Sequence, residues 1–180
     1  APLRPEARAA MLRAMEMSSN PSSVHAAGRA ARKLVEDARE QVAAFAGAKP
    51  GDVVFTSGGT EANALALRAA VAGALDAESR ITRLFVAATA HDSVLSVARD
   101  LAETVPGLAL SVIPVTEHGR IDPLRFRSLL MNGKGRVLVS LLFVNNETGL
   151  IEDSAGLAAV LRKEGGEGAL LHVDGVSSGY

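Results

Sequence analysis

The chain has 180 residues, with 19 Lys and Arg against 20 Asp and Glu, which gives a formal net charge of −1. This near balance argues against a nucleic-acid partner, because such a surface needs a clustered basic excess. The absence of Cys excludes disulfides and thiolate metal sites, and the four His residues show no metal-ligand spacing. No apolar run reaches the length of a membrane span, so we expect a soluble, cytoplasmic protein with no membrane partner.

Two helices are predicted at the start of the chain. The first covers about residues 4–17. The second covers residues 22–46, where apolar side chains recur every three or four positions and form a single stripe. Ser22 or Ser23 is expected to cap the start of this helix, and Gly47 to end it.

From about residue 50 onward, short β-branched runs alternate with stretches of helical periodicity. The runs predict strands at residues 52–56, 83–87, 109–113, 136–144 and 169–173. The stretches between them predict helices at residues 61–73, 92–103, 123–130 and 154–164. This alternation predicts an α/β fold with a mostly parallel sheet and helices on both of its faces. We find no repeat and no linker, so one domain is expected over residues 1–180.

A glycine-rich turn lies between the first predicted strand and the next helix, at Ser57-Gly58-Gly59-Thr60. Glycine lets the backbone turn tightly and approach a ligand, and a helix N-terminus offers free N–H groups to a phosphate. The turn matches neither of the common nucleotide-binding loops, because no Lys follows and the spacing is not GxGxxG. An ordinary strand-to-helix turn capped by Thr60 explains the same residues.

Several local patterns follow one another along nearly the whole chain. They are Asn20-Pro-Ser-Ser-Val-His25 leading into Gly28, the segment from Phe55 to Asn63, Asn145-Asn-Glu-Thr-Gly149, and His172-Val-Asp174, with His91 at the start of a helix. In this order they resemble the cysteine desulfurase group of the class V aminotransferases, which are fold-type I enzymes that depend on pyridoxal 5′-phosphate. The resemblance implies the large, cofactor-binding domain of such an enzyme.

The resemblance assigns a role to several residues of this sequence. Gly59 and Thr60 would hold the cofactor phosphate, and His91 would stack on the pyridine ring. Asn146 would contact the cofactor or the substrate. Each of these residues also has a plain structural interpretation, such as a helix start for His91 or a strand-end turn for Asn146.

Asp174 has the clearest chemical role. It follows an apolar strand, at the edge where open α/β sheets bind their ligands. A carboxylate against the pyridine nitrogen would keep that nitrogen protonated, so that the ring withdraws electrons. The resemblance therefore implies His91 and Asp174 as catalytic residues, although Asp174 as a turn cap is the alternative. His172 would be a packed or supporting group.

The sequence departs from the family pattern at Ser177, where the family usually has a Gln that reaches the phenolic oxygen of the cofactor. Ser177 is shorter, but it is still expected at the cofactor. Both ends look truncated, with the C-terminal small domain absent. The Lys that forms the Schiff base with the cofactor and the Cys that carries the persulfide would lie outside the chain, and we expect the fragment alone to be inactive.

The resemblance implies an enzyme that converts L-cysteine to L-alanine and passes the sulfur to an enzyme thiol as a persulfide. It also implies a homodimer, a sulfur-acceptor protein and a role in iron-sulfur cluster assembly. Another member of the superfamily, such as a selenocysteine lyase or an aminotransferase, is the nearest alternative. A non-catalytic module that binds a phosphate ligand or a partner is the alternative from a different class.

Overall fold

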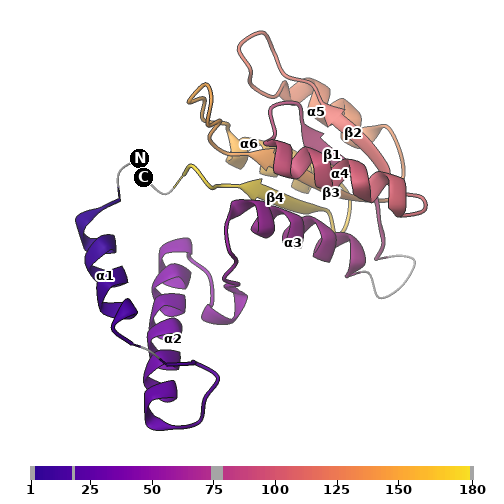
Figure 1. Cartoon of the computed structure of the whole chain (residues 1–180). Coiled ribbons are helices and arrows are strands. Elements are labelled where there is room, and N and C mark those ends of the chain that lie inside the picture. Colours follow the sequence, from indigo (N-terminus) through magenta and orange to yellow (C-terminus); the bar gives the residue numbers. More distant parts are fainter. Residues whose placement is uncertain (1–2, 18, 74–78, 179–180) are drawn as a thin grey trace. The chain divides into compact units, whose positions relative to one another are not determined.

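The computed structural model describes residues 3–17, 19–73 and 79–178. The chain divides into two compact units, residues 1–55 and residues 56–180 (Figure 1). The first unit contains helices α1 (Pro5–Met15) and α2 (Ala26–Ala46) and a short 3₁₀ turn, η1 (Pro50–Asp52). The second contains the sheet and the remaining helices. The interpretation of residues 1–180 as a single domain stays a prediction.

Helix α2 ends as the sequence predicts but begins differently. Gly47 caps its C-terminus in the left-handed conformation, at φ 65°. At the N-terminus the cap is His25, whose Nδ1 accepts a hydrogen bond from the Gly28 N–H at 3.2 Å. The prediction of a cap at Ser22 or Ser23 was therefore wrong, because both lie in the turn that precedes the helix.

The predicted strand at residues 52–56 was also wrong. Pro50 and Gly51 favour the 3₁₀ turn η1, and Val53 to Thr56 belong to no strand. The Arg39 side chain donates to the Val53 carbonyl and lies over the Phe55 ring, 5.0 Å from its centroid. In this segment the Val53 carbonyl therefore binds a side chain, and no neighbouring strand pairs with residues 53–56 in the described part of the chain.

The second unit is built on a four-stranded, fully parallel sheet in the order β2-β1-β3-β4. This arrangement confirms the predicted α/β class. The elements in chain order are α3 (Gly59–Ala72), β1 (Ile81–Ala87), α4 (Asp92–Thr104), β2 (Ala109–Ile113), α5 (Pro123–Met131), β3 (Arg136–Leu142), α6 (Ser154–Glu164) and β4 (Leu170–Asp174). The chain steps from β1 to β2 and then returns to the other side of β1. A topological switch point therefore lies between β1 and β3.

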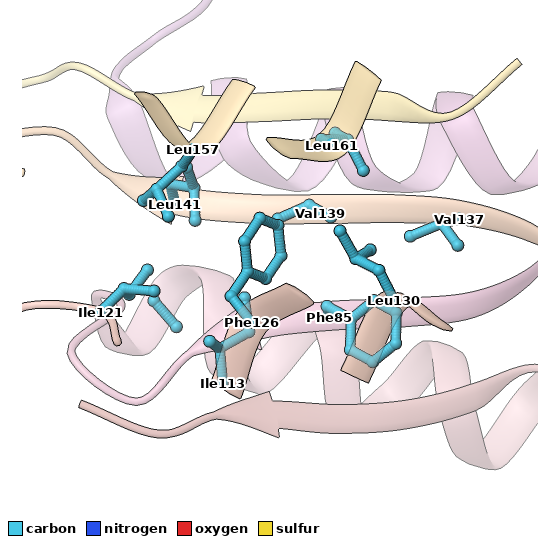
Figure 2. Packing of buried hydrophobic residues seen from close by; sticks show 11 residues of the cluster. Phe85, Ile113, Ile121, Phe126, Leu130, Val137, Val139, Leu141, Leu157 and Leu161 are labelled. Atoms are coloured by element: carbon cyan, nitrogen blue, oxygen red, sulfur yellow. The ribbon is translucent and has the colours of Figure 1, made fainter. Parts of the chain in front are cut away.

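Helices cover both faces of the sheet, as predicted, and each face has its own apolar core. Figure 2 shows the face under α5 and α6, where Phe126 and Leu157 of the helices belong to one apolar cluster with Phe85, Val139 and Leu141 of the strands. On the opposite face, Leu67 of α3 and Val94 of α4 belong to the second cluster. The central strand β3 is buried on both sides, in keeping with its apolar sequence.

Two strand ends position the site. Strand β3 ends at Leu142, before the predicted Val144, because Val144 instead forms an antiparallel bridge with Ile151 across a tight loop. Strand β4 runs through Asp174, so this acidic residue is the last member of the strand. Since the sheet is parallel, both ends lie at its carboxyl edge, beside the switch point.

Candidate functional site

A pocket of about 310 Å³ opens at the carboxyl edge of the sheet. Residues from α3, from the segments after β1 and β3, and from the end of β4 contribute to its wall. All six residues predicted to bind the cofactor line it, together with four that the sequence analysis did not assign. The lining residues are Gly59, Thr60, Asn63, His91, Ser93, Leu142, Asn146, Asp174, Val176 and Ser177.

The glycine-rich turn forms one side of the pocket, at the N-terminus of α3. Gly58 is the N-cap in an extended conformation, and the Thr56 hydroxyl donates to its carbonyl at 3.1 Å. Glu61 folds back and accepts from both the amide and the hydroxyl of Ser57, at 2.7 and 2.6 Å. The hydrogen bond from the Ser57 hydroxyl, followed by that from its amide, holds the pKa of Glu61 below its usual value. The acidic side chain is thus occupied with the turn itself, and the N–H groups of the first helical turn remain to bind an anion.

The segment after β4 passes against Gly59. A Cβ at this position would lie 2.5 Å from the Val176 side chain, far inside contact distance. The absence of a side chain at residue 59 therefore leaves room for the Val176 methyl group against the turn. This close approach places Val176 and Ser177 in the wall of the same pocket as Thr60.

Asp174 is a nearly buried carboxylate, with only 4% of its surface exposed. Its Oδ2 accepts a hydrogen bond from Asn63 Nδ2 at 2.8 Å, and its Oδ1 accepts one from the Val176 N–H at 3.2 Å. Each carboxylate oxygen can accept two hydrogen bonds, so Asp174 retains acceptor capacity toward the pocket. A buried carboxylate with spare capacity can pair with a cationic ring nitrogen.

His91 is the N-cap of α4, so its structural interpretation and its predicted role apply together. Its Nδ1 accepts from the Ser93 N–H at 3.1 Å and lies 2.8 Å from the Ser93 hydroxyl oxygen. The cap fixes the imidazole beside the pocket, and the residue as a whole is exposed. An aromatic ring held in this way at a pocket wall can stack on a planar ligand.

Asn146 and Ser177 complete the rim. Asn146 is exposed in the loop after β3. The preceding Asn145 shapes this loop, because its side-chain oxygen accepts from the amides of Glu147 and Thr148, at 3.0 and 2.9 Å. Ser177 is partly buried, three residues after Asp174.

His172 lies on the same face of β4 as Asp174 but outside the pocket lining. Its Nδ1 is 2.8 Å from the hydroxyl of Ser140, its neighbour across β3 and β4. Burial lowers the pKa of His172, and the nearby Asp174 charge raises it by a smaller amount. The imidazole is therefore neutral at pH 7. This arrangement fits a packed supporting residue.

Two buried polar residues of the pocket wall, Asn63 and Ser93, were not predicted from the sequence. For Asn63 a signal was available. It shares a four-residue spacing with Leu67 and Val71, which makes it the one polar member of the buried stripe of α3. For Ser93 the sequence carries no such signal, because a Ser in the first turn of a helix is ordinary.

The pocket fits pyridoxal phosphate in its chemistry. It offers a helix N-terminus and a Thr hydroxyl for the phosphate, a buried carboxylate for a ring nitrogen and an imidazole at the wall. The approach of Val176 to Gly59 brings the carboxylate segment and the phosphate turn into one wall. Among residues 3–17, 19–73 and 79–178, no three His, Asp or Glu side chains gather into a metal-binding group. No helix in the same ranges is long and apolar enough to cross a membrane.

Comparison with known proteins agrees with this chemistry. The sequence profile described as aminotransferase class-V matches residues 5–179. An IscS-like cysteine desulfurase of Mycobacterium tuberculosis is 34% identical over 164 residues, which are 91% of this chain and 42% of that protein. A cysteine desulfurase of Cereibacter sphaeroides is 38% identical over 179 residues, which are 98% of this chain and 43% of that protein.

Among solved structures, the NifS-like protein of Rickettsia africae superposes with a TM-score of 0.80 at 28% sequence identity. The superposition covers 99% of this chain and 46% of the other. The chain thus spans less than half the length of the proteins that it matches.

Proposed function

The chain belongs to the class-V aminotransferase family, in which it groups with the cysteine desulfurases, and from this we propose that the protein is a pyridoxal-phosphate-dependent cysteine desulfurase. In the proposed reaction the C–S bond of L-cysteine breaks and the sulfur joins an enzyme thiol. The products are L-alanine and an enzyme persulfide.

One observation carries the proposal. Gly59, Thr60, His91, Asn146, Asp174 and Ser177 were selected from motifs scattered along the sequence, and all six line one pocket at the carboxyl edge of the sheet. At this pocket a buried carboxylate and a helix N-terminus belong to one wall. This combination suits a ligand with a phosphate group at one end and a basic ring nitrogen at the other.

The cofactor of the family is pyridoxal 5′-phosphate. When bound, it supplies an electron sink for the negative charge that develops on the substrate carbon. In our proposal the first turn of α3 and the Thr60 hydroxyl bind the phosphate. Asp174 holds a proton on the ring nitrogen, and His91 covers one face of the ring. Asn146 and Ser177 orient polar groups at the rim.

Ser177 favours a second candidate within the same family. A serine three residues after Asp174 reaches less far into the pocket than the longer Gln that the family usually carries there. A different contact at this position can change which bond of the substrate is broken. A selenocysteine lyase or an aminotransferase is therefore the second candidate.

We also propose a homodimer that works in the cytoplasm and delivers sulfur to an acceptor protein for iron-sulfur cluster assembly. The names of the relatives support the sulfur chemistry. The exposed apolar side chains Leu34, Val42 and Phe45 of α2 support an additional contact surface. Light scattering on the purified protein measures the oligomeric state directly.

The decisive experiment incubates the intact protein, loaded with cofactor, with L-cysteine. We expect alanine and protein-bound persulfide in equal amounts in the first turnover. Preferential release of selenium from selenocysteine, or transfer of the amino group to an oxo acid as the main reaction, would select the second candidate. Failure to bind the cofactor at all would point to the non-catalytic module.

A further inference from the structure

Asn63 lies in the wall of the pocket, and only 4% of its surface is exposed. The spacing of the buried residues of α3 predicts an apolar residue at this position. Leu67 and Val71 follow it on the same helical face and belong to the apolar core. A polar amide placed among such residues costs free energy unless its hydrogen bonds are satisfied. The partners of Asn63 therefore indicate why an amide is there.

The direction of these hydrogen bonds follows from the chemistry of the groups. The Asp174 carboxylate only accepts, so Asn63 must present its NH₂ group to it, at 2.8 Å. The same Nδ2 lies 3.1 Å from Ser93 Oγ, so its second hydrogen is donated there. The Ser93 proton is then free to be donated to His91 Nδ1 at 2.8 Å.

These hydrogen bonds form a chain that runs in one direction, with Asn63 donating to Ser93 and Ser93 donating to His91. His91 Nδ1 accepts from both the hydroxyl and the amide of Ser93, so the imidazole proton resides on Nε2. At the other end of the chain, Asn63 holds one oxygen of Asp174 while the Val176 amide holds the other. One buried amide thus touches the carboxylate directly and the imidazole through one serine.

We propose that Asn63 is a positioning residue that holds the Asp174 carboxylate toward the ring nitrogen of the cofactor and, through Ser93, fixes the tautomer of His91. The inference rests on the proposed function, because it concerns the same cofactor. It assigns to Asn63 the task of keeping a charged group correctly aimed, which a leucine of similar size cannot perform because it has no hydrogen to donate.

The test compares the affinity of the apoprotein for pyridoxal phosphate with its affinity for 1-deazapyridoxal phosphate, in which carbon replaces the ring nitrogen. Both affinities are measured on the same preparation of the intact protein. Any fraction that fails to fold lowers both signals together, so the ratio of the two affinities reports only the contact at the ring nitrogen. We expect wild type to prefer pyridoxal phosphate.

In Asn63→Leu we expect this preference to fall about tenfold, the usual effect of losing one hydrogen bond to a charged group. Asn63→Ala serves as a second variant and should show the same fall. The matched control is Asn132→Leu, because Asn132 also donates to a serine hydroxyl, that of Ser128 at 3.3 Å, but lies exposed after α5. It should keep the wild-type ratio. In an Asp174→Asn background, Asn63→Leu should produce no further change.

Two outcomes would overturn the inference, and they are distinguishable. If wild type shows the preference and Asn63→Leu retains it within about twofold, Asn63 is only a packed residue and the proposed function stands. If wild type itself shows no preference, the pairing of Asp174 with the ring nitrogen is wrong. The proposed site and the role of Asn63 then fail together.

Discussion

The two edges of the parallel sheet use polar side chains in opposite ways. At the amino edge, Arg83 and Arg136 direct their guanidinium groups at main-chain carbonyls. At the carboxyl edge, Asp174 bonds to another side chain, that of Asn63, and faces a pocket. The amino edge therefore uses charge to close the fold, and the carboxyl edge keeps charge accessible to a ligand.

Arg83 illustrates the closing role. Its guanidinium lies over the Phe85 ring, 4.9 Å from the centroid. It donates to the carbonyls of Leu129, Leu130, Asn132 and Gly133, at the C-terminus of α5. These carbonyls have no partners within a helix, and a cation there also opposes the helix dipole. Partial burial lowers the pKa of Arg83, but an arginine so placed stays charged.

In this sheet, a charged side chain at the amino edge contacts the main chain, and one at the carboxyl edge lies beside a pocket. The guanidinium groups of Arg83 and Arg136 are partly buried and donate to main-chain carbonyls, so their charges are engaged within the fold. A buried charge that shares only part of its capacity with side chains is available for binding.

The largest expected effect is a loss of turnover on substitution of Asp174 at the carboxyl edge. In the intact protein, Asp174→Ala removes the group that would hold a proton on the ring nitrogen, and it also leaves the Asn63 amide without its acceptor. Deleting one partner of a buried charged pair costs about 3–5 kcal/mol, and 1.36 kcal/mol corresponds to about tenfold in rate. We therefore expect turnover per bound cofactor to fall at least about a hundredfold. Turnover close to wild type would show that Asp174 only caps the turn after β4.

An intermediate effect, on the free energy of unfolding, is expected on substitution of Arg83 at the amino edge. Arg83→Ala leaves the last carbonyls of α5 without their donor, so we expect a loss of about 2 kcal/mol in the free energy of unfolding. The affinity for the cofactor should stay unchanged, because Arg83 is absent from the pocket lining. Urea unfolding and a cofactor titration measure the two quantities. The exposed Arg99 of α4 gives the control variant, Arg99→Ala. Weaker cofactor binding in Arg83→Ala alone would contradict the separation of the two edges.

The smallest expected effect concerns His172, a supporting residue beside the pocket, and the pH dependence of the free energy of unfolding. Burial holds the pKa of His172 below 6.5. Between pH 6.5 and the lowered pKa, His172 is therefore protonated in the unfolded chain but neutral in the folded chain. The stability associated with His172 is complete above pH 6.5 and is lost as the pH falls through the lowered pKa. His172→Gln should therefore flatten the decline of stability below pH 6.5. Equal slopes in wild type and His172→Gln would refute this.

Much of the fold was predictable because its signals are local. The buried strand at Val137 to Leu142 and the amphipathic helices come from patterns within a few residues. The wrong strand at residues 52–56 shows the limit, since strand formation depends on a distant partner that a β-branched run does not specify. The cap at His25 was missed for a related reason, because two serines nearby are the usual choice.

For the site too, the residues within local motifs were predicted, and the contacts between distant residues were not. The motifs identified the residues that face the pocket, and the structure places them together. The supporting contact of Asn63 with Asp174 joins residues 111 positions apart in the sequence. No local pattern contains such a pair. The contact of Asn63 with Ser93 joins residues 30 positions apart, so no local pattern contains that pair either.

Helix α3 also fixes the distance between two parts of the site. Gly59 begins the helix and Asn63 follows four residues later, so the rise of the helix sets the spacing between the phosphate turn and the residue that holds Asp174, at about 6 Å along the helix axis. Each residue added to an α-helix rotates the following side chain by about 100°. One residue inserted between them would swing Asn63 out of line with the carboxylate, whereas an exchange at the exposed Ala62 would leave it in place. The number of residues between Gly59 and Asn63 is therefore fixed, whereas the identity of the residue at position 62 is not.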